Sequence, residues 1–149
     1  MTPVRFTVPG APVAKGRPRL GTIKGQARAF TPAKTRAYEA EVRHYAAEAM
    51  RGRALIEGAV AVEVTAFLPI PKSMPKRDRA RIGAAVFPTT RPDVDNYLKS
   101  VLDALNGVVI HDDAQVVTAT AAKLFTADQP CLAVTISEAW RSATARAAA

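Results

Sequence analysis

The segment from residue 60 to residue 68 constrains the fold of this chain more than any other. Apolar side chains occupy every second position there, at Val60, Val62, Val64, Ala66 and Leu68. Successive side chains of a strand point to opposite faces, so this row predicts a strand with one face against a core. Pro69 and Pro71 mark its end, because proline has no backbone N–H for a sheet ladder.

Two other segments have apolar residues at the spacing of a helix. Tyr38, Val42, Tyr45 and Ala49 recur at helical intervals. Thr31-Pro32 predicts an N-cap followed by proline at the first helical position, and Gly52 predicts the end of this helix. A second helix is expected from about Asp95 to Asn106 and to end at Gly107. Its apolar stripe comprises Leu98, Val101, Leu102 and Leu105. A short basic helix is expected after Pro75.

Three more strands complete the prediction, at Val4 to Val8, Val116 to Leu124 and Leu132 to Ile136, the last two joined closely enough to form a hairpin. The order strand, helix, strand, short helix, helix, strand, strand predicts an α+β fold in which a mixed sheet packs against helices. We expect a single domain over residues 1–149. Residues 10–30 or so, rich in Gly, Pro and cations, predict a long exposed loop or loose hairpin, and residues 140–149 predict a frayed tail.

Composition excludes several classes of protein. No run approaches the roughly 18 apolar residues of a membrane helix. The N-terminal residues MTPVRFTVPG contain no apolar signal segment, so a cytosolic location is expected. The single cysteine, Cys131, excludes an internal disulfide and a cysteine-rich zinc site.

Positive charge is concentrated in two clusters. The chain has a net charge of +8, and the stretch from Lys15 to Arg36 contains no acidic residue. The basic residues of that stretch are Lys15, Arg17, Arg19, Lys24, Arg28, Lys34 and Arg36. The second cluster comprises Lys72, Lys76, Arg77, Arg79 and Arg81, interrupted by Asp78. Such clusters are often only solvated faces, but two of them flanking an acidic segment favour a nucleic-acid partner.

The acidic segment begins at Arg91-Pro92-Asp93-Val94-Asp95. Pro92 biases Arg91 toward an extended conformation, so Asp93 should lie just before the helix and Asp95 near its N-cap. Carboxylates two residues apart diverge on a helix, and the strand-to-helix transition expected here brings them together. Lys99 lies four residues after Asp95, on the same helix face. Asp112-Asp113 follows from the next turn.

A cluster of carboxylates with one ammonium group suits phosphodiester cleavage. Mg²⁺ prefers oxygen ligands and keeps several waters, so a few carboxylates and a phosphate oxygen complete its coordination. Ordinary structural interpretations also exist. Asp93 or Asp95 can simply cap a helix, Asp95 and Lys99 can form a surface ion pair, and Asp112-Asp113 can form a turn. Asp103 is expected to be a solvated helix residue and His111 a loop histidine.

The motifs R-P-D-V-D-N-Y-L-K, L-D-A-L-N-G and H-D-D-A-Q-V resemble those of the RusA-type Holliday-junction resolvases, the crossover-junction endodeoxyribonucleases. That family carries D-x-D-N-x-x-K, then D-A-L, then D-D-x-Q-V. Residues 8–19 and the T-P-A-K-T at residues 31–35 resemble phage and prophage members. The resemblance runs from the first strand to about Ile136.

The resemblance implies a function and a site. Asp93, Asp95 and Asp113 match the catalytic metal-binding aspartates, Lys99 matches the essential lysine, and Asp112 matches the adjacent acidic position. It implies cleavage of four-way DNA junctions in recombination and repair, by a homodimer that needs Mg²⁺ or Mn²⁺. A two-fold dimer also suits a junction that must be cut on two opposed strands. The candidate DNA-binding residues are Lys15, Arg17, Arg19, Lys76, Arg77 and Arg91.

Two alternatives remain from the residues alone. The same carboxylates would permit a metal nuclease for flaps or other branched DNA. A non-catalytic DNA-binding accessory protein is the other possibility, and its acidic residues would only cap a helix. Lys99 in register with Asp95 favours catalysis, because a binding module gains nothing from carboxylates that repel phosphate.

Overall fold

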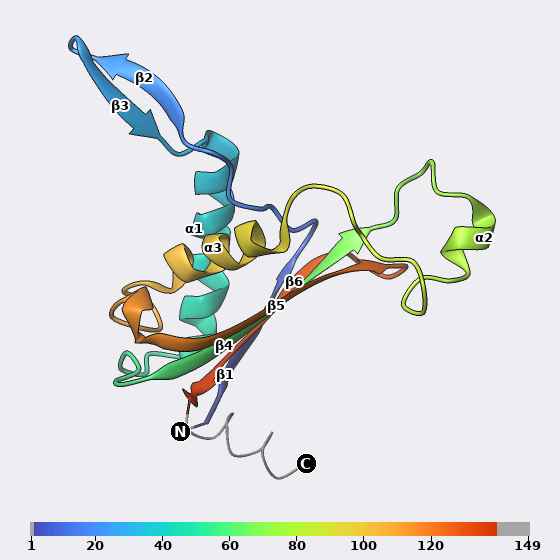
Figure 1. The fold of residues 1–149 in the computed structure, drawn as a ribbon. Coiled ribbons are helices and arrows are strands. Elements are labelled where there is room, and N and C mark those ends of the chain that lie inside the picture. The colour runs from blue at the N-terminus through green and yellow to red at the C-terminus, as the bar shows by residue number, and fades with distance from the viewer. Residues whose placement is uncertain (1, 140–149) are drawn as a thin grey trace.

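The computed structural model describes residues 2–139 (Figure 1). Its elements, in chain order, are β1 (Val4–Pro9), β2 (Arg19–Ile23), β3 (Gln26–Phe30), α1 (Ala33–Met50), β4 (Val60–Pro69), α2 (Lys76–Arg79), α3 (Val94–Leu105), the 3₁₀ turn η1 (Asp113–Gln115), β5 (Val116–Thr126) and β6 (Cys131–Glu138). The α+β class and the mixed sheet are confirmed. The predicted tail at residues 140–149 lies outside the described residues.

The main sheet has the strand order β1-β6-β4-β5. β4 pairs with β5 in parallel and with β6 in antiparallel orientation, and β6 also pairs with β1 in antiparallel orientation. The predicted hairpin of the last two strands is therefore wrong, because β4 lies between β5 and β6. The physical reason is burial: Val60, Ala61, Val62 and Val64 are all at most 2% exposed, so β4 requires a central place in the sheet.

The core lies between the sheet and two helices. α1 and α3 pack against each other, α1 also contacts β1, and α3 also contacts β4 and β5. The buried row of α1 includes Tyr38 and Val42, as predicted, but continues through Ala46 and Met50, whereas Tyr45 and Ala49 are half-buried. From the predicted apolar stripe of α3, Val101 and Leu105 are fully buried in this core.

The start of α1 differs by one residue from the prediction. Pro32, not Thr31, is the N-cap, and it makes no side-chain capping bond. Proline can still begin the helix because its fixed φ suits this position and its missing N–H would have no helical partner. At the other end, Arg51 and Gly52 adopt positive φ values of 50° and 74°, which stops the helix close to the predicted residue.

Two segments project from this body (Figure 1). β2 and β3 pair only with each other and form a hairpin that extends beyond the end of α1, within the stretch predicted as a loop or loose hairpin. On the other side of the molecule, the segment that contains α2 projects from the end of β4. Over residues 2–139, no helix combines the length and the apolar character needed to cross a membrane.

Candidate active site

The first two predicted site residues lie at the start of α3. Asp93 is its N-cap, with extended backbone angles φ −71° and ψ 151°, and Asp95 lies in the first helical turn. The predicted strand-to-helix transition is therefore present, although the cap is Asp93 rather than Asp95. The Asp93 carboxylate makes no capping hydrogen bond and is exposed. Both carboxylates are consequently accessible from solvent.

Lys99 lies beside this pair. Its Nζ donates to Asp95 Oδ2 at 3.3 Å, and the two side chains are 60% and 59% exposed. The predicted i, i+4 register is thus confirmed as a contact. The contact alone has the form of an ordinary surface ion pair, but it places an ammonium group next to the Asp95 carboxylate, two residues after Asp93.

Lys123 on β5 holds the segment that leads into α3. Its Nζ donates to the backbone oxygens of Thr90 at 2.7 Å and Pro92 at 2.8 Å. These bonds connect the sheet to the residue immediately before Asp93. Sequence reasoning did not predict this role. The available signal was a single lysine among the small and apolar residues VVTATAAKLFT of β5.

The N-terminal basic segment is also bonded to α3. The backbone N–H of Lys15 donates to Asn96 O at 2.9 Å, and Ser100 Oγ donates to Val13 O at 3.2 Å. Ser100 is only 1% exposed, so this contact belongs to the packed interior. The segment that carries Arg17 and Arg19 is therefore fixed relative to the helix that carries Asp95.

Lys15 itself forms ion pairs within the protein. Its Nζ donates to Asp103 Oδ2 and lies 3.7 Å from Glu39 Oε1. The hydrogen bond to Asp103 raises the pKa of Lys15, against an opposing effect of burial. Burial raises the pKa of the Glu39 carboxyl, whose Oε1 is buried without a hydrogen-bond donor within the described residues. Asp103, predicted as a solvated residue, is instead the main partner of Lys15.

A cleft of about 660 Å³ opens beside Pro92, at the base of the hairpin. Its walls include Arg17, Arg19 and Lys34, together with the side chain of Tyr97. Burial raises the pKa of the Tyr97 hydroxyl, so this group stays neutral at physiological pH. The cleft is therefore cationic, and its lining includes Pro92, the residue before Asp93.

The other predicted DNA-binding residues lie toward the α2 segment. Arg91 is exposed in the segment before α3, and Lys76 and Arg77 are exposed on α2. Arg77 Nε lies 3.8 Å from Asp78 Oδ1, a loose surface pair. In Figure 1 the hairpin and the α2 segment stand on opposite sides of the start of α3.

Asp112 and Asp113 differ sharply in their surroundings. The Asp112 carboxylate accepts a hydrogen bond from Ala114 N at 2.8 Å and caps η1. Gln115 completes this capping box and also donates to the backbone oxygens of Ile56 and Gly58. Asp113 is exposed, and no hydrogen bond or ion pair engages its carboxylate within residues 2–139. Of the two, Asp113 is the one whose carboxylate makes no bond to the rest of the described residues.

The structure does not bring Asp113 to the other two carboxylates within one chain. α3 separates them, because Asp93 precedes the helix and η1 follows its far end; twelve helical residues span about 18 Å. The path of β5 indicates the same separation. This strand starts at Val116, directly after η1, and its contact with Pro92 is made by Lys123, seven residues further along the strand. Across the described part of the chain, no three Asp, Glu, His or Cys side chains lie close enough to hold a metal ion together.

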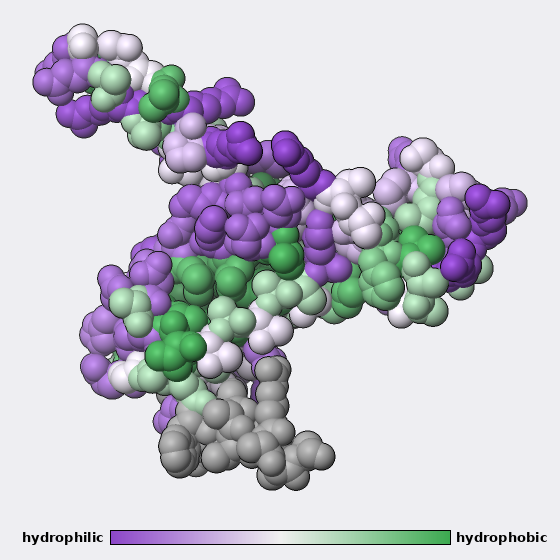
Figure 2. All heavy atoms as spheres, viewed as in Figure 1, coloured by the Kyte–Doolittle hydropathy of each residue, from purple (hydrophilic) through white to green (hydrophobic). Residues whose placement is uncertain are grey.

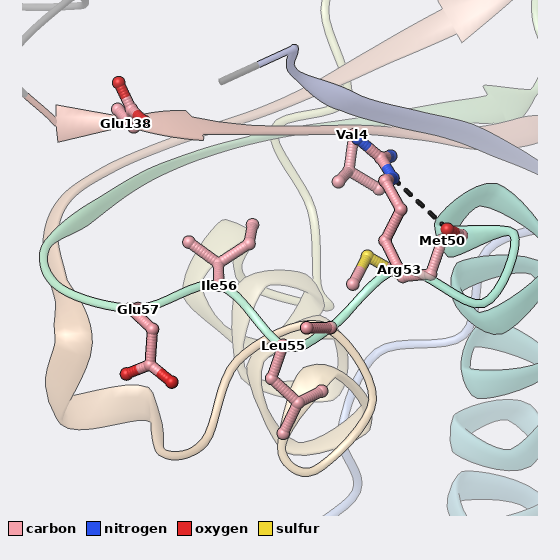
Figure 3. Close-up of a pocket in the computed structure, with 8 residues that line it drawn as sticks. Val4, Met50, Arg53, Leu55, Ile56, Glu57 and Glu138 are labelled. Carbon is pink, nitrogen blue, oxygen red and sulfur yellow. Dashed lines mark hydrogen bonds between the residues drawn. The ribbon is translucent and has the colours of Figure 1, made fainter.

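A second hollow, of about 300 Å³, lies at the opposite end of α1 (Figure 3). It is lined by Val4, Met50, Arg53, Ala54, Leu55, Ile56, Glu57 and Glu138, and Arg53 Nε donates to Met50 O at 3.2 Å. His111 Nε2 lies 3.0 Å from Glu57 Oε1, which ties the histidine to the rim of this hollow rather than to Asp93. None of the predicted site residues lines it.

Comparison with known proteins identifies the family of the chain. Residues 9–137 match the family described as endodeoxyribonuclease RusA. The chain belongs to this family. It is also 39% identical over 139 residues to the uncharacterized protein YqaN of Bacillus subtilis (strain 168), an alignment that covers 91% of this chain and 96% of that protein. The RusA-family chain is accordingly an endodeoxyribonuclease of the class that cleaves Holliday junctions, as its motifs predicted.

Proposed function

We propose that this RusA-family chain cleaves four-way DNA junctions as a Mg²⁺-dependent homodimer, in which each active site combines Asp93, Asp95 and Lys99 of one copy with Asp113 of the other. The family match supports the reaction and the substrate. The position of Asp113 at the far end of α3 supports the division of the site between two copies.

The donor set fits a hard divalent cation. Asp93 and Asp95 are exposed, lie two residues apart at the transition into a helix, and supply oxygen ligands only. Mg²⁺ commonly binds through one or two carboxylates and substrate phosphate while keeping several waters, and Mn²⁺ accepts similar ligands. When bound there, the ion would polarise the scissile phosphate and stabilise charge on the leaving oxygen.

The protein side chains have separate tasks in this proposal. Asp93 and Asp95 orient the cation beside the cationic cleft, where Arg17 and Arg19 hold the phosphate backbone. Lys99, 3.3 Å from Asp95, stabilises negative charge that develops on the phosphate. Lys123 keeps the segment before Asp93 in place through its two bonds to backbone oxygens.

The need for a second copy follows from distance. Ligands of one Mg²⁺ lie about 2.0–2.1 Å from it, so carboxylates at opposite ends of an 18 Å helix cannot share an ion. A two-fold dimer supplies the same aspartate from its partner and produces two equivalent sites. Two sites also match the requirement for cuts on two opposed strands of the junction.

The deciding experiment uses heterodimers of inactive variants. Asp95→Asn and Asp113→Asn each inactivate the homodimer under this proposal. When the two variants are co-expressed with different tags and purified as heterodimers, one site contains both substitutions and the other contains neither. We therefore expect single nicks in a labelled four-way junction, dependent on Mg²⁺ and absent with EDTA.

The matched control is the heterodimer of Asp93→Asn with Asp95→Asn. Both substitutions come from the same half of the site, so each site retains one defect and no nicking is expected. If the Asp95→Asn and Asp113→Asn heterodimer is also inactive, the divided site is refuted. Sedimentation of the wild-type protein as a monomer in the presence of junction would refute the dimer itself.

Flap cleavage is the alternative to test with the same protein. Wild-type protein is incubated with a four-way junction, a flap and a linear duplex of the same sequence. Symmetric nicking of the junction supports the proposal. Equal or faster cutting of the flap would replace junction resolution by general cleavage of branched DNA.

A further inference from the structure

The β2–β3 hairpin has no packing role that would explain its presence. All five residues of β3 and four of the five residues of β2 are exposed, and the two strands pair only with each other. A two-stranded hairpin without a packed face is marginally stable in water. Its projection from the body in Figure 1 therefore indicates a surface that acts on a partner.

The charge of the hairpin indicates what kind of partner this is. It carries Arg19, Lys24 and Arg28, and the chain has no acidic residue before Glu39. Figure 2 shows hydrophilic residues on the hairpin, with hydrophobic ones among them, and a mostly hydrophilic surface where the hairpin joins the body. A cationic surface without compensating carboxylates attracts a polyanion.

The strand register divides the hairpin into two different faces. Arg19 pairs with Phe30, and Gly21 pairs with Arg28, so these four residues share one face. The Phe30 ring lies directly over Gly21, where a Cβ would approach Phe30 Cε2 to 2.7 Å. Glycine at this position therefore leaves room for the Phe30 ring on the face that carries the two arginines. The opposite face is uncharged and carries Leu20, Thr22, Ala27 and Ala29.

We propose that the hairpin is a DNA-binding arm that enters the major groove of a duplex arm beside the active site, with the face that carries Arg19 and Arg28 toward the DNA. Strands in a ribbon lie about 4.8 Å apart, and the major groove, about 12 Å wide, admits a two-stranded ribbon. Arginine supplies planar donors that fit both phosphate oxygens and guanine edges. This inference rests on the proposed function only in that DNA is the ligand.

The base of the hairpin continues into the site. Arg19 begins β2 and also lines the cleft whose lining includes Pro92, next to Asp93. A duplex bound along this cleft therefore runs from the carboxylates toward the hairpin. Single-stranded DNA fits less well, because such binding uses several aromatic side chains as stacking surfaces, and the ring of Phe30 is the only one on the hairpin.

A second copy of the chain is the competing partner for this surface. Stable protein interfaces use about 20–30 residues on each side. β2 and β3 offer only five residues each, which is far fewer than such an interface needs. On the face that carries Arg19 and Arg28, arginines of two copies facing one another across a two-fold axis would also repel. The hairpin is thus better suited to DNA than to the main dimer contact.

The test compares two double variants that remove the same charge. Arg19→Gln with Arg28→Gln changes the proposed contact face. Arg5→Gln with Arg51→Asn is the control, since these residues lie near each other at the far end of α1, and Asn tolerates the positive φ of 50° at residue 51. Binding to a labelled four-way junction is measured in EDTA over a range of salt concentrations.

We expect the hairpin variant to bind at least about tenfold more weakly at physiological salt, with a log–log salt slope smaller by roughly 1.8 for two lost phosphate contacts. The control variant should bind like wild type. If both variants lost the same affinity for the junction, the loss would follow from net charge alone and the proposal would be refuted. Wild-type affinity of the hairpin variant would also overturn it.

A shortened hairpin provides the second measurement. Residues 20–29 are replaced by Asn-Gly, which can join the cross-strand partners Arg19 and Phe30 in a tight turn. This variant should keep its melting temperature and oligomeric state and lose affinity for junctions. If the shortened variant were a monomer where the wild type is a dimer, the hairpin would be a dimer contact and not a DNA-binding arm. Because binding is measured without Mg²⁺, loss of affinity would support the arm even if wild-type protein cleaved no DNA.

Discussion

Lys99 offers the clearest separation of catalysis from stability. Its ammonium group lies 3.3 Å from Asp95 Oδ2, and both side chains are more than half exposed. An exposed i, i+4 ion pair contributes about 0.3–0.5 kcal/mol. Lys99→Met keeps most of the aliphatic side chain, so the melting temperature should fall by less than about 2 °C for a domain of this size.

The same substitution should affect the reaction far more. If the ammonium group stabilises charge on the phosphate in the transition state, its loss should slow cleavage by on the order of 10²- to 10³-fold, or about 2.7–4 kcal/mol. The assay is single-turnover cleavage of a labelled four-way junction at saturating protein and Mg²⁺. Junction affinity in EDTA should be nearly unchanged.

Two control variants define the interpretation. Lys99→Arg retains the positive charge and should keep part of the rate. Glu48→Gln removes the exposed i, i+4 pair of His44 and Glu48, whose atoms lie 3.6 Å apart on α1, and should cleave at the wild-type rate. Cleavage by Lys99→Met at the wild-type rate would refute the catalytic role and leave Lys99 as a surface ion pair.

Three further substitutions test the support around the site. Lys123→Met removes both bonds to the segment before α3, including that to Pro92, and should reduce single-turnover cleavage roughly tenfold to a hundredfold with little change in junction affinity; an equal loss of affinity would contradict a positioning role. Asp112→Ala should cost about 0.5–2 kcal/mol in urea unfolding through loss of its cap and leave measurable cleavage, whereas complete inactivity of the folded protein would make Asp112 a ligand. Lys15→Met should lower the free energy of unfolding by about 1 kcal/mol near neutral pH. The bond to Asp103 raises the pKa of Lys15 above 10.5, so the full contribution to stability is present below pH 10.5. It disappears as the pH rises through the raised pKa. The unfolding free energies of wild type and variant should therefore converge in urea titrations at strongly alkaline pH.

Local patterns were sufficient for most of the secondary structure. The alternation along β4, the helical spacing of α1 and α3, and the Pro92-Asp93 transition each depend on neighbours within a few residues, and the structure confirms them. The same holds for the contact between Asp95 and Lys99, because residues four apart on a helix always share a face. The motif spacing was also specific enough to predict the RusA family.

Strand order and long-range contacts required the tertiary structure. A short link between β5 and β6 predicts a hairpin, but the buried residues Val60, Ala61, Val62 and Val64 of β4 place that strand between them. Likewise, sequence spacing suggested that Asp113 joins Asp93 and Asp95, and only the length and direction of α3 separate them within one chain. Local interactions determine each element, whereas the competition among elements for one core decides which side chains finally meet.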